Sequence, residues 1–324
     1  MQTTTDKILQ HQINAGIKGR KKGHSYESVI ANKLNNAEYP YAPKIKFPKH
    51  VVRGNVDDIL LSKIANYLNW EKIYSAKTFC TGYLATSEVG TKEITINDHT
   101  ISSTKSDIIL ELQNEFRETR YIGVSIKQCN NKKPTNAQVF FSTARAFCDL
   151  LSENSIKISQ SGIDAMRQFC GDPGFRPIDN SDCKNRISTP DRYFWEEINQ
   201  EGRIELERIF TDYQDEITRL ILQKGYHGDP FPPEIILHKT KKIEGDEEFA
   251  IYSMDEFIDL SRKYSPFVFR KYRVTKGSCK EPVGIEHLAP RFGVIQMQRG
   301  GQKQHPTQLQ FNLKAGYFYA LDKL

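Results

Sequence analysis

The spacing of apolar residues predicts a helix near the start of the chain. From about Ser25 onwards, Tyr26, Ile30 and Leu34 recur with the 3.6-residue period of an α-helix. Glu27 precedes Ile30 by three residues and Leu34 by seven, so it lies at the edge of the same apolar face. The pattern therefore predicts a carboxylate at the inner edge of this first helix.

A loop and a second helix follow in the pattern. Prolines and lysines interrupt residues 38–50, which predicts a loop. Asn55 is suited to cap a helix whose apolar side carries Val56, Ile59 and Leu60. Residues 73–105 show no sustained period, and we expect irregular structure with short strands there.

The clearest strand patterns lie in the middle of the chain. Residues 107–112 and 121–127 are rich in aliphatic residues and are joined by a polar segment, which predicts a long hairpin. Side chains alternate along a strand, so Ser125 and Lys127 face one side of the sheet together. When the two strands pair, Asp107 at the start of the first strand lies near both.

The second half of the chain alternates between helical and strand patterns. A helix is predicted from Thr135 or Asn136 to about Leu151, and a helical stretch over roughly 191–224. Ser253 and Glu256 form a capping-box pattern that opens a short helix. Strands are predicted at 234–240, 247–252, 267–275, 293–298 and 308–313, the last two around a Gly-Gly turn.

These elements predict an α/β protein with a central mixed β-sheet flanked by helices. The segment from Gly171 to Thr189 is rich in Pro, Gly and Asp and is the best candidate for a boundary. We therefore expect a catalytic core over residues 1–170. Residues 171–324 then form a helical segment, strands that complete the sheet and a C-terminal hairpin, either as a second domain or as part of one continuous domain.

Positive charge is concentrated in two places, although the net charge of +6 over 324 residues is modest. Lys18, Arg20, Lys21 and Lys22 lie close together, and residues 287–320 contain no Asp or Glu. A one-sided basic surface is typical of a protein that binds a polyanion, although a solvated basic face gives the same pattern.

Composition narrows the class of protein further. Hydrophobic residues make up 38% of the chain and charged residues 27%, which indicates a globular protein. No apolar stretch is long enough to span a membrane, and the first residues lack a signal-peptide pattern. The six cysteines form no CxxC pair, so we expect free thiols in a reducing cytoplasm and no zinc site.

The hairpin and the first helix together supply a set of groups suited to phosphodiester hydrolysis. Asp107 and Glu27 are carboxylates, which bind hard cations such as Mg²⁺. Such a cation polarises a phosphate and activates water, and Lys127 can offset the charge that develops on the phosphate. Each residue alone also fits a structural role; it is their combination with Ser125 that favours an active site. Phosphate-binding glycine loops, zinc-binding HExxH helices and GxSxG elbows do not occur in the sequence.

These residues resemble a known family. His24-Ser25-Tyr26-Glu27, Lys105-Ser106-Asp107 and Ser125-Ile126-Lys127-Gln128 are similar to the pattern of the PD-(D/E)xK nucleases. Within that superfamily the chain resembles type II restriction endonucleases, in particular the branch that carries Asn or Gln at the second acidic position and cuts four-base palindromes. The resemblance runs through most of the chain.

The resemblance implies a role for each matched position. Asp107 and Glu27 would bind Mg²⁺, Lys127 would be the catalytic lysine, and Ser125 stands where a second acid or its amide substitute is expected. This serine is a departure that leaves open a weakened or inactive centre. The resemblance also implies a prokaryotic enzyme and a partner methyltransferase that protects the host DNA.

The C-terminal hairpin is the candidate for reading DNA bases. One face of its strands is apolar and the other carries amides, which pair with adenine in the major groove as Arg and Lys pair with guanine. An ordinary amphipathic hairpin with its polar face in water is the alternative. The expected DNA-binding residues are Lys21, Lys22, Lys132, Lys133, Thr135, Asn136, Gln138, Gln296, Gln298, Arg299, Gln302, Lys303, Gln304, Gln308, Gln310 and Asn312.

Two other functions remain open at this point. A repair, junction-resolving or transposon-end nuclease of the same fold needs less base reading, so the amide-lined hairpin argues against it. A DNA-binding protein built on a decayed nuclease is the alternative that Ser125 supports.

Overall fold

The computed structural model describes residues 4–84, 92–133, 136–180, 192–223, 228–241, 243–271, 286–299 and 307–314. They form two compact units. Within the described residues, the first unit contains residues 4–137, 221–260 and Lys314, and the second contains 138–220 and 261–313. This division does not follow the predicted boundary at residues 170 and 171, because a later pair of strands returns to the first sheet.

A mixed sheet of six strands forms the centre of the first unit, as predicted. The strand order is β1-β9-β8-β6-β5-β2, and β6 and β8 are parallel while the other neighbours are antiparallel. The elements of this unit are α1 (Thr4–Asn35), β1 (Val51–Arg53), α2 (Val56–Leu68), β2 (Ser75–Cys80), β3 (Ile94–Ile96), β4 (His99–Ile101), β5 (Ile108–Gln113), β6 (Thr119–Gln128), β8 (Pro233–Lys241), β9 (Glu248–Ser253) and α7 (Met254–Ser261).

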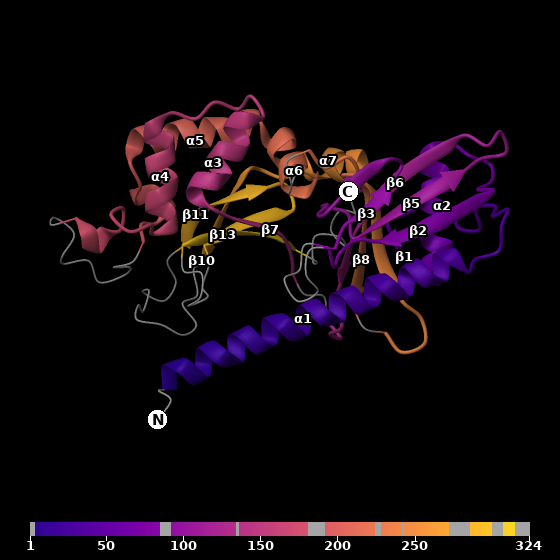
Figure 1. Cartoon of the computed structure of the whole chain (residues 1–324). Helices are drawn as coiled ribbons and strands as arrows, with labels where there is room; N and C mark the ends of the chain where they lie inside the picture. The colour runs from indigo at the N-terminus through magenta and orange to yellow at the C-terminus, as the bar shows by residue number, and fades with distance from the viewer. Residues whose placement is uncertain are drawn as a thin grey trace. The chain divides into compact units, whose positions relative to one another are not determined.

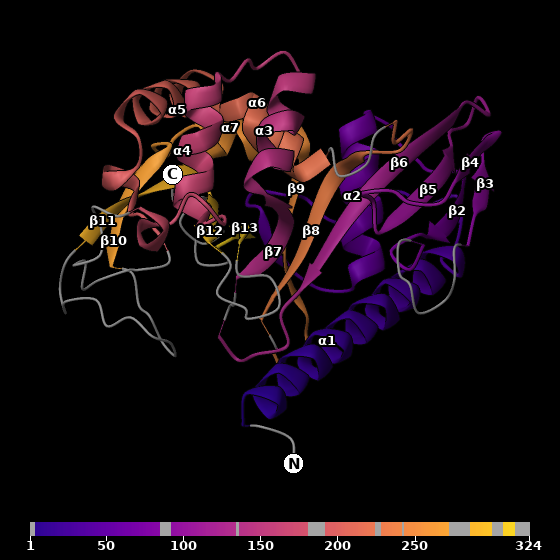
Figure 2. The ribbon, with the colours of Figure 1, turned by 60° about the vertical axis from the view of Figure 1, so that its left-hand side comes forward.

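Helices α1 and α2 cover one face of this sheet. The long α1, indigo in Figures 1 and 2, runs beside β2. Ile30 and Leu34 from α1 are fully buried together with the apolar side of α2 and the inward residues of β5 and β6. A smaller cluster that includes Ile109 and Phe231 packs with the β3–β4 hairpin. The sheet is therefore anchored by a continuous apolar layer against its two helices.

The sequence placed most of these elements correctly. The β5–β6 hairpin, the strands β8 and β9 and the loop before β1 lie where the pattern predicted them. Ser253 and Glu256 form the predicted capping box, with reciprocal bonds of 2.8 and 3.3 Å between side chain and backbone. Asn55 is at the predicted N-cap of α2, but its side chain makes no capping hydrogen bond. Helix α1 begins at Thr4, much earlier than predicted, because glycines lower helix propensity without forbidding a helix.

The second unit has a five-stranded sheet in the order β10-β11-β12-β13-β7, with helices packed on one face. Its core is aromatic: the ring of Phe147 lies 4.9 Å from that of Phe311 and 6.4 Å from those of Phe210 and Phe292. Its elements are β7 (Ala137–Thr143), α3 (Ala144–Glu153), α4 (Gln160–Cys170), the 3₁₀ turns η1 (Pro177–Asp179) and η3 (Trp195–Glu197), α5 (Gln200–Asp212), α6 (Gln214–Gln223), β10 (Phe267–Lys271), β11 (Glu286–Phe292), β12 (Ile295–Arg299) and β13 (Gln308–Leu313).

The predicted helix from residue 135 or 136 to residue 151 is wrong in its first half. Ala137–Thr143 forms strand β7, and the helix α3 starts only at Ala144. The segment Val139–Phe140–Phe141 contains the branched and aromatic residues that favour strands. Thr143 then ends the strand and caps α3 by accepting a hydrogen bond of 3.2 Å from the backbone of Ala146.

Two elements of this unit were not predicted, and others were predicted with different limits. The sequence analysis predicted neither helix α4 nor strand β11. The helical stretch expected over 191–224 is divided into α5 and α6 at Tyr213. Strand β10 is described as far as Lys271, and the Gly-Gly turn of the last hairpin lies outside the described residues.

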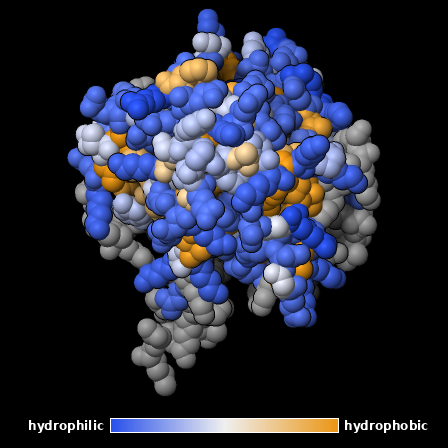
Figure 3. All heavy atoms as spheres, turned by 90° about the vertical axis from the view of Figure 1, so that its right-hand side faces the viewer, coloured by the Kyte–Doolittle hydropathy of each residue, from blue (hydrophilic) through white to orange (hydrophobic). Residues whose placement is uncertain are grey.

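The face of the molecule that Figure 3 draws is mainly hydrophilic. Figure 3 shows one face on which apolar residues occur as small separate groups, a distribution that is ordinary for a protein surface. Among the described helices, none is long and apolar enough to cross a membrane.

The aromatic core of the second unit can be tested with a matched pair of phenylalanines. Phe147 is fully buried in α3, whereas Phe141 in β7 is 55% exposed. We expect F147A to lower the free energy of unfolding by about 3–5 kcal/mol through loss of buried area and creation of a cavity. F141A is the control and should change it by less than about 1 kcal/mol. Denaturant unfolding measures both; equal effects would contradict the strand assignment of residues 137–143.

Candidate active site

Strand β6 is longer than the strand beside it, and this creates the site. Pairing of β6 with β5 ends at Val124 and Ile108, while β6 continues to Gln128 with β8 alone as its neighbour. Residues 125–128 therefore have one edge without a strand. Asp107, the residue immediately before β5, lies at this edge.

Three donors from β6 converge on one oxygen of Asp107. Its Oδ2 accepts hydrogen bonds from the backbone N–H of Ile126 at 2.5 Å, from Nζ of Lys127 at 3.0 Å and from Oγ of Ser125 at 3.3 Å. Among the described residues, no donor reaches Oδ1, which leaves that oxygen available for another ligand. The side chains of Asp107 and Lys127 are only 18% and 22% exposed, so their ion pair is shielded from most of the solvent.

The backbone of Asp107 is fixed as firmly as its side chain. Its N–H donates to the carbonyl oxygen of Val124 at 2.9 Å. Its carbonyl oxygen accepts from the N–H groups of Thr81 and Gly82 at 3.0 and 3.1 Å. Thr81 also donates from Oγ1 to the carbonyl oxygen of Ser106 at 2.7 Å. Asp107 is thus held from both neighbouring strands, and its carboxylate has little freedom to turn away.

Glu27 reaches the same cluster from helix α1. It is only 7% exposed, and its Oε2 has no hydrogen-bond partner among the described residues. Burial raises the pKa of Glu27 to about 8; the negative charge of Asp107 acts in the same direction, and the positive charge of Lys127 opposes it. A buried carboxyl with an unused oxygen beside a second carboxylate is suited to accept a cation.

Gly82 makes room for this glutamate. A Cβ atom at Gly82 would lie 2.0 Å from Oε2 of Glu27 and 2.9 Å from its carboxyl carbon. No side chain can be accommodated at that distance, so a glycine is required for Glu27 to occupy its present position. The same loop residue donates its N–H to Asp107, and it therefore positions both carboxylates.

Two further residues adjust the electrostatics, and sequence reasoning had missed both. Burial lowers the pKa of Lys105 to about 8, and the nearby Lys127 lowers it further while Asp107 raises it. His238 on β8 is the register partner of Lys127, and burial together with that lysine lowers its pKa to about 3. His238 is therefore neutral near neutral pH and adds no charge to the cluster. His238 does not stand out in the sequence, because its position depends on the pairing of β8 with β6, and Lys105 was quoted there only as part of the motif before Asp107.

The two carboxylates are a suitable donor set for a hard cation. Oδ1 of Asp107 and Oε2 of Glu27 accept no hydrogen bond from the part of the chain that the structure describes, and carboxylate oxygens are the ligands that Mg²⁺ prefers. Among the described residues, no group of three or more His, Cys, Asp or Glu side chains could hold a metal. Mg²⁺ is commonly held by one or two protein carboxylates with waters and substrate phosphate completing its shell, so two are enough.

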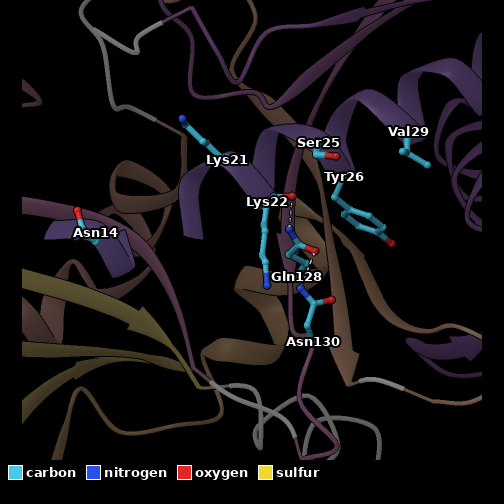
Figure 4. Close-up of a pocket in the computed structure, with 8 residues that line it drawn as sticks. All are labelled: Asn14, Lys21, Lys22, Ser25, Tyr26, Val29, Gln128 and Asn130. Atoms are coloured by element: carbon cyan, nitrogen blue, oxygen red, sulfur yellow. Dashed lines mark hydrogen bonds between the residues drawn. The ribbon is translucent and has the colours of Figure 1, made fainter. Parts of the chain in front are cut away.

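A pocket of about 600 Å³ lies between α1 and the end of β6, and its lining includes Tyr26 and Gln128, the sequence neighbours of Glu27 and Lys127. In Figure 4, Gln128 lies between Lys22 and Asn130, donating to the carbonyl oxygen of Lys22 at 2.9 Å and accepting from Asn130 at 3.2 Å. The predicted Lys21 and Lys22 line this pocket, and both are exposed. Gln128 and Asn130 were not predicted as DNA-binding residues, although Gln128 directly follows Lys127 at the end of β6.

The other predicted DNA-binding residues fall into three groups. Lys132, Lys133 and Asn136 are exposed after β6, and Gln138 is exposed on β7. The amides of β12 and β13 lie on the face opposite to Met297 and Phe311, as the alternation predicted; Gln298, Gln308, Gln310 and Asn312 are half-buried there, whereas Gln296 is buried. Thr135, Gln302, Lys303 and Gln304 lie outside the described residues.

Arg299 differs from the amides of this hairpin. It pairs with Leu309 and therefore shares the face of the buried Met297 and Phe311. Its guanidinium donates to the carbonyl oxygen of Tyr193 at 2.8 Å and stacks near the rings of Phe169 and Phe194. This side chain holds η3 and α4 against the sheet, on the face opposite to the amides.

Comparison with known proteins identifies the fold. No protein-family model matches the chain, and no curated protein matches its sequence. Among solved structures, the chain is similar to the restriction endonuclease MspI in complex with its cognate DNA. That match has a TM-score of 0.52 and 13% identity over 96% of this chain and all of the other.

The chain has a restriction-endonuclease fold. This confirms the predicted fold class of a mixed central sheet flanked by helices. At this level of identity the similarity concerns the fold, and the roles of Glu27, Asp107, Ser125 and Lys127 rest on the geometry of the site.

The close approach of Gly82 to Glu27 predicts a specific coupling. We expect G82A to lower stability by about 1–3 kcal/mol, because the added methyl forces the carboxyl out of place. In the E27A background the same substitution should have almost no effect, and a double-mutant cycle by thermal unfolding measures the difference. G23A is the control, because a Cβ there would lie at an ordinary 3.7 Å from Glu27. Additive effects of G82A and E27A would contradict the arrangement.

The raised pKa of Glu27 predicts a pH-dependent stability in the absence of divalent metal. Its pKa in the folded state, about 8, exceeds the ordinary value of 4.5, so folding favours the protonated carboxyl. The resulting stabilisation is fully present below the ordinary pKa and is lost as the pH rises through about 8. We therefore expect the melting temperature of the wild type relative to E27Q to fall between about pH 5 and pH 9.

The control for this titration is E38Q, which removes the charge of an exposed glutamate in the turn that follows α1. Its melting temperature should follow that of the wild type across the same range. If E27Q also follows the wild type throughout, the carboxyl of Glu27 is not buried as described.

Proposed function

We propose that this chain is a Mg²⁺-dependent endonuclease that hydrolyses phosphodiester bonds at a short specific site in double-stranded DNA, a type II restriction enzyme. The observation that carries the proposal is the convergence of Lys127, Ser125 and the Ile126 backbone on Asp107, with Glu27 facing the same point. The fold supports it, since the similar MspI was crystallised with its cognate DNA.

The proposed chemistry divides among the residues of the cluster. Asp107 and Glu27 would hold Mg²⁺, which would polarise the phosphate and supply an activated water. Because burial raises the pKa of Glu27 to about 8, its carboxyl would give up a proton to hold the cation at neutral pH. Lys127, oriented by its bond to Asp107, directs its remaining N–H groups towards the phosphate and stabilises the negative charge of the transition state.

Ser125 takes the position of a second acid in the resembled family, and its proposed role is to orient Asp107. Its hydroxyl donates to Oδ2, so it adds a donor and no charge. Glu27 then supplies the second carboxylate from the helix. With Glu27 deprotonated, the cluster then has the two carboxylates of Asp107 and Glu27.

Positive and amide groups outside the cluster would hold the DNA. Lys21, Lys22, Gln128 and Asn130 line the pocket between α1 and the end of β6 and would contact phosphates of the cleaved strand. The amides of β12 and β13 are the proposed base-reading surface. A methyltransferase that modifies the same site is the functional partner implied by this proposal, and a prokaryotic cytoplasm is the implied location.

The decisive experiment is a cleavage assay on unmethylated phage DNA with and without Mg²⁺. We expect discrete fragments that require Mg²⁺ and are lost in D107N, which keeps the shape of the side chain but removes its charge. K127M should reduce the cleavage rate by at least about 10²-fold, because a charged donor to the transition state is removed. K72M, at an exposed lysine before β2, is the control and should cleave normally.

Two other outcomes would replace the proposal with its alternatives. A Mg²⁺-dependent smear or cleavage only at junctions and ends would indicate a repair, junction or transposon-end nuclease. Intact DNA that is nevertheless retarded on a gel would indicate a DNA-binding protein without catalytic activity.

A further inference from the structure

The outer face of β12 and β13 carries a connected row of amides. The register pairs Gln296 with Asn312 and Gln298 with Gln310, while Met297 pairs with Phe311 on the buried side. The amides of Gln296 and Gln298 approach to 3.2 Å, and those of Gln298 and Asn312 also approach to 3.2 Å. Three side chains thus form a continuous hydrogen-bonded chain across two strands.

Such a chain can run in either of two directions. An amide oxygen and an amide nitrogen have nearly the same shape, so the direction must be assigned from the surrounding donors and acceptors. If Asn312 donates to Gln298, its carbonyl oxygen faces outwards. If Asn312 accepts from Gln298, its NH₂ group faces outwards. The two directions therefore present opposite chemical groups to a ligand.

Arg270 decides the direction. This residue on β10 lies against the remaining atom of the Gln296 amide, with Nε at 3.3 Å and Nη1 also in contact. A guanidinium can only donate, so that atom of Gln296 must be oxygen. The NH₂ of Gln296 then donates to Gln298, and Gln298 donates to Asn312. The chain runs Arg270 to Gln296 to Gln298 to Asn312.

Burial makes this direction hold in the free protein. Gln296 is only 2% exposed, so water cannot readily satisfy its amide. Reversal would place two donors face to face at a buried position, which is costly because the groups have no alternative partners. Gln298 and Asn312 are half-buried and open to the surface, so the ordered chain ends where a ligand can reach it.

We propose that Arg270 is a positioning residue that fixes the polarity of the base-reading face, so that Asn312 presents a hydrogen-bond donor to the DNA. A donor at that point selects a base edge that offers an acceptor, such as guanine O6 and N7 or thymine O4. It disfavours cytosine, which offers the N4 amino donor in the major groove. This inference rests on the proposed site-specific nuclease and assigns to Arg270 a role in its sequence preference.

Three variants separate this role from a merely structural one. Q298E keeps the acceptor that Gln296 needs but removes the donor to Asn312, so Asn312 must turn and present its oxygen. R270M removes the donor that fixes the direction, and R270K restores a donor at the same place. The readout is the ratio of cleavage rates on duplexes that differ from the preferred site by one base pair, which cancels any uniform loss of affinity.

At the base pair that Asn312 contacts, Q298E should reduce the preference for a base with a hydrogen-bond acceptor by about tenfold or more, the size of one good base contact. R270M should weaken the same preference, and R270K should retain it. If the chain ran in the opposite direction, Q298E would leave the group that Asn312 presents unchanged. An unaltered preference in both Q298E and R270M would overturn the proposal.

A DNA-free measurement keeps this inference distinct from the proposed function. In ¹⁵N-labelled protein, the side-chain NH₂ groups of Gln296 and Gln298 should be protected from hydrogen exchange, and that of Asn312 should exchange freely. R270M should reduce the protection of Gln296. Protection of Asn312 in the wild type would overturn the polarity even if cleavage is site-specific. Absence of site-specific cleavage with the expected protection would refute the proposed function and leave the amide chain intact.

Discussion

The hydrogen bond from the backbone of Ile126 to Asp107 is the interaction on which the candidate site depends. The pairing of β5 with β6 stops at Ile108 and Val124, and β6 continues beyond it. There the side chain of Asp107 takes the place of a strand as the hydrogen-bond partner of the β6 backbone. Because the backbone of β6 is fixed by β8 on its other side, the carboxylate is held at a set distance from Ser125 and Lys127. The geometry of three side chains is thereby determined by sheet pairing more than by their own packing.

This dependence explains why the central cluster could be predicted from the sequence. Alternation along 121–127 places Ser125 and Lys127 on one face, and the hairpin brings Asp107 opposite them whatever the rest of the fold. Glu27 was predicted as a carboxylate at the edge of the first helix that joins the residues of the hairpin. Its burial and its fit against Gly82 depend on a loop between β2 and β3 that has no pattern of its own.

The errors have equally local causes. Residues 139–151 satisfy a helical period, yet their first half consists of branched and aromatic residues that pair as a strand. Arg299 was grouped with the amides because it follows them in the chain. Side chains alternate along β12, however, and this alternation places Arg299 with Met297 on the buried face. His238 and Arg270 had no distinguishing pattern, since each acts through a strand that is distant in the sequence, and the burial of Lys105 beside Asp107 is a property of the fold. Most of the sheet and the central four residues could thus be predicted, while the residues that modulate them could not.

The parallel pairing of β6 with β8 has a consequence for the order in which the protein can be built. Strand β6 ends at Gln128, but β8 begins only at Pro233, after the whole helical part of the second unit. During synthesis, Asp107 and Lys127 are therefore present long before the strand that supports the backbone between them. The charged cluster can therefore reach its final geometry only after the helices of the second unit and β8 have been synthesised.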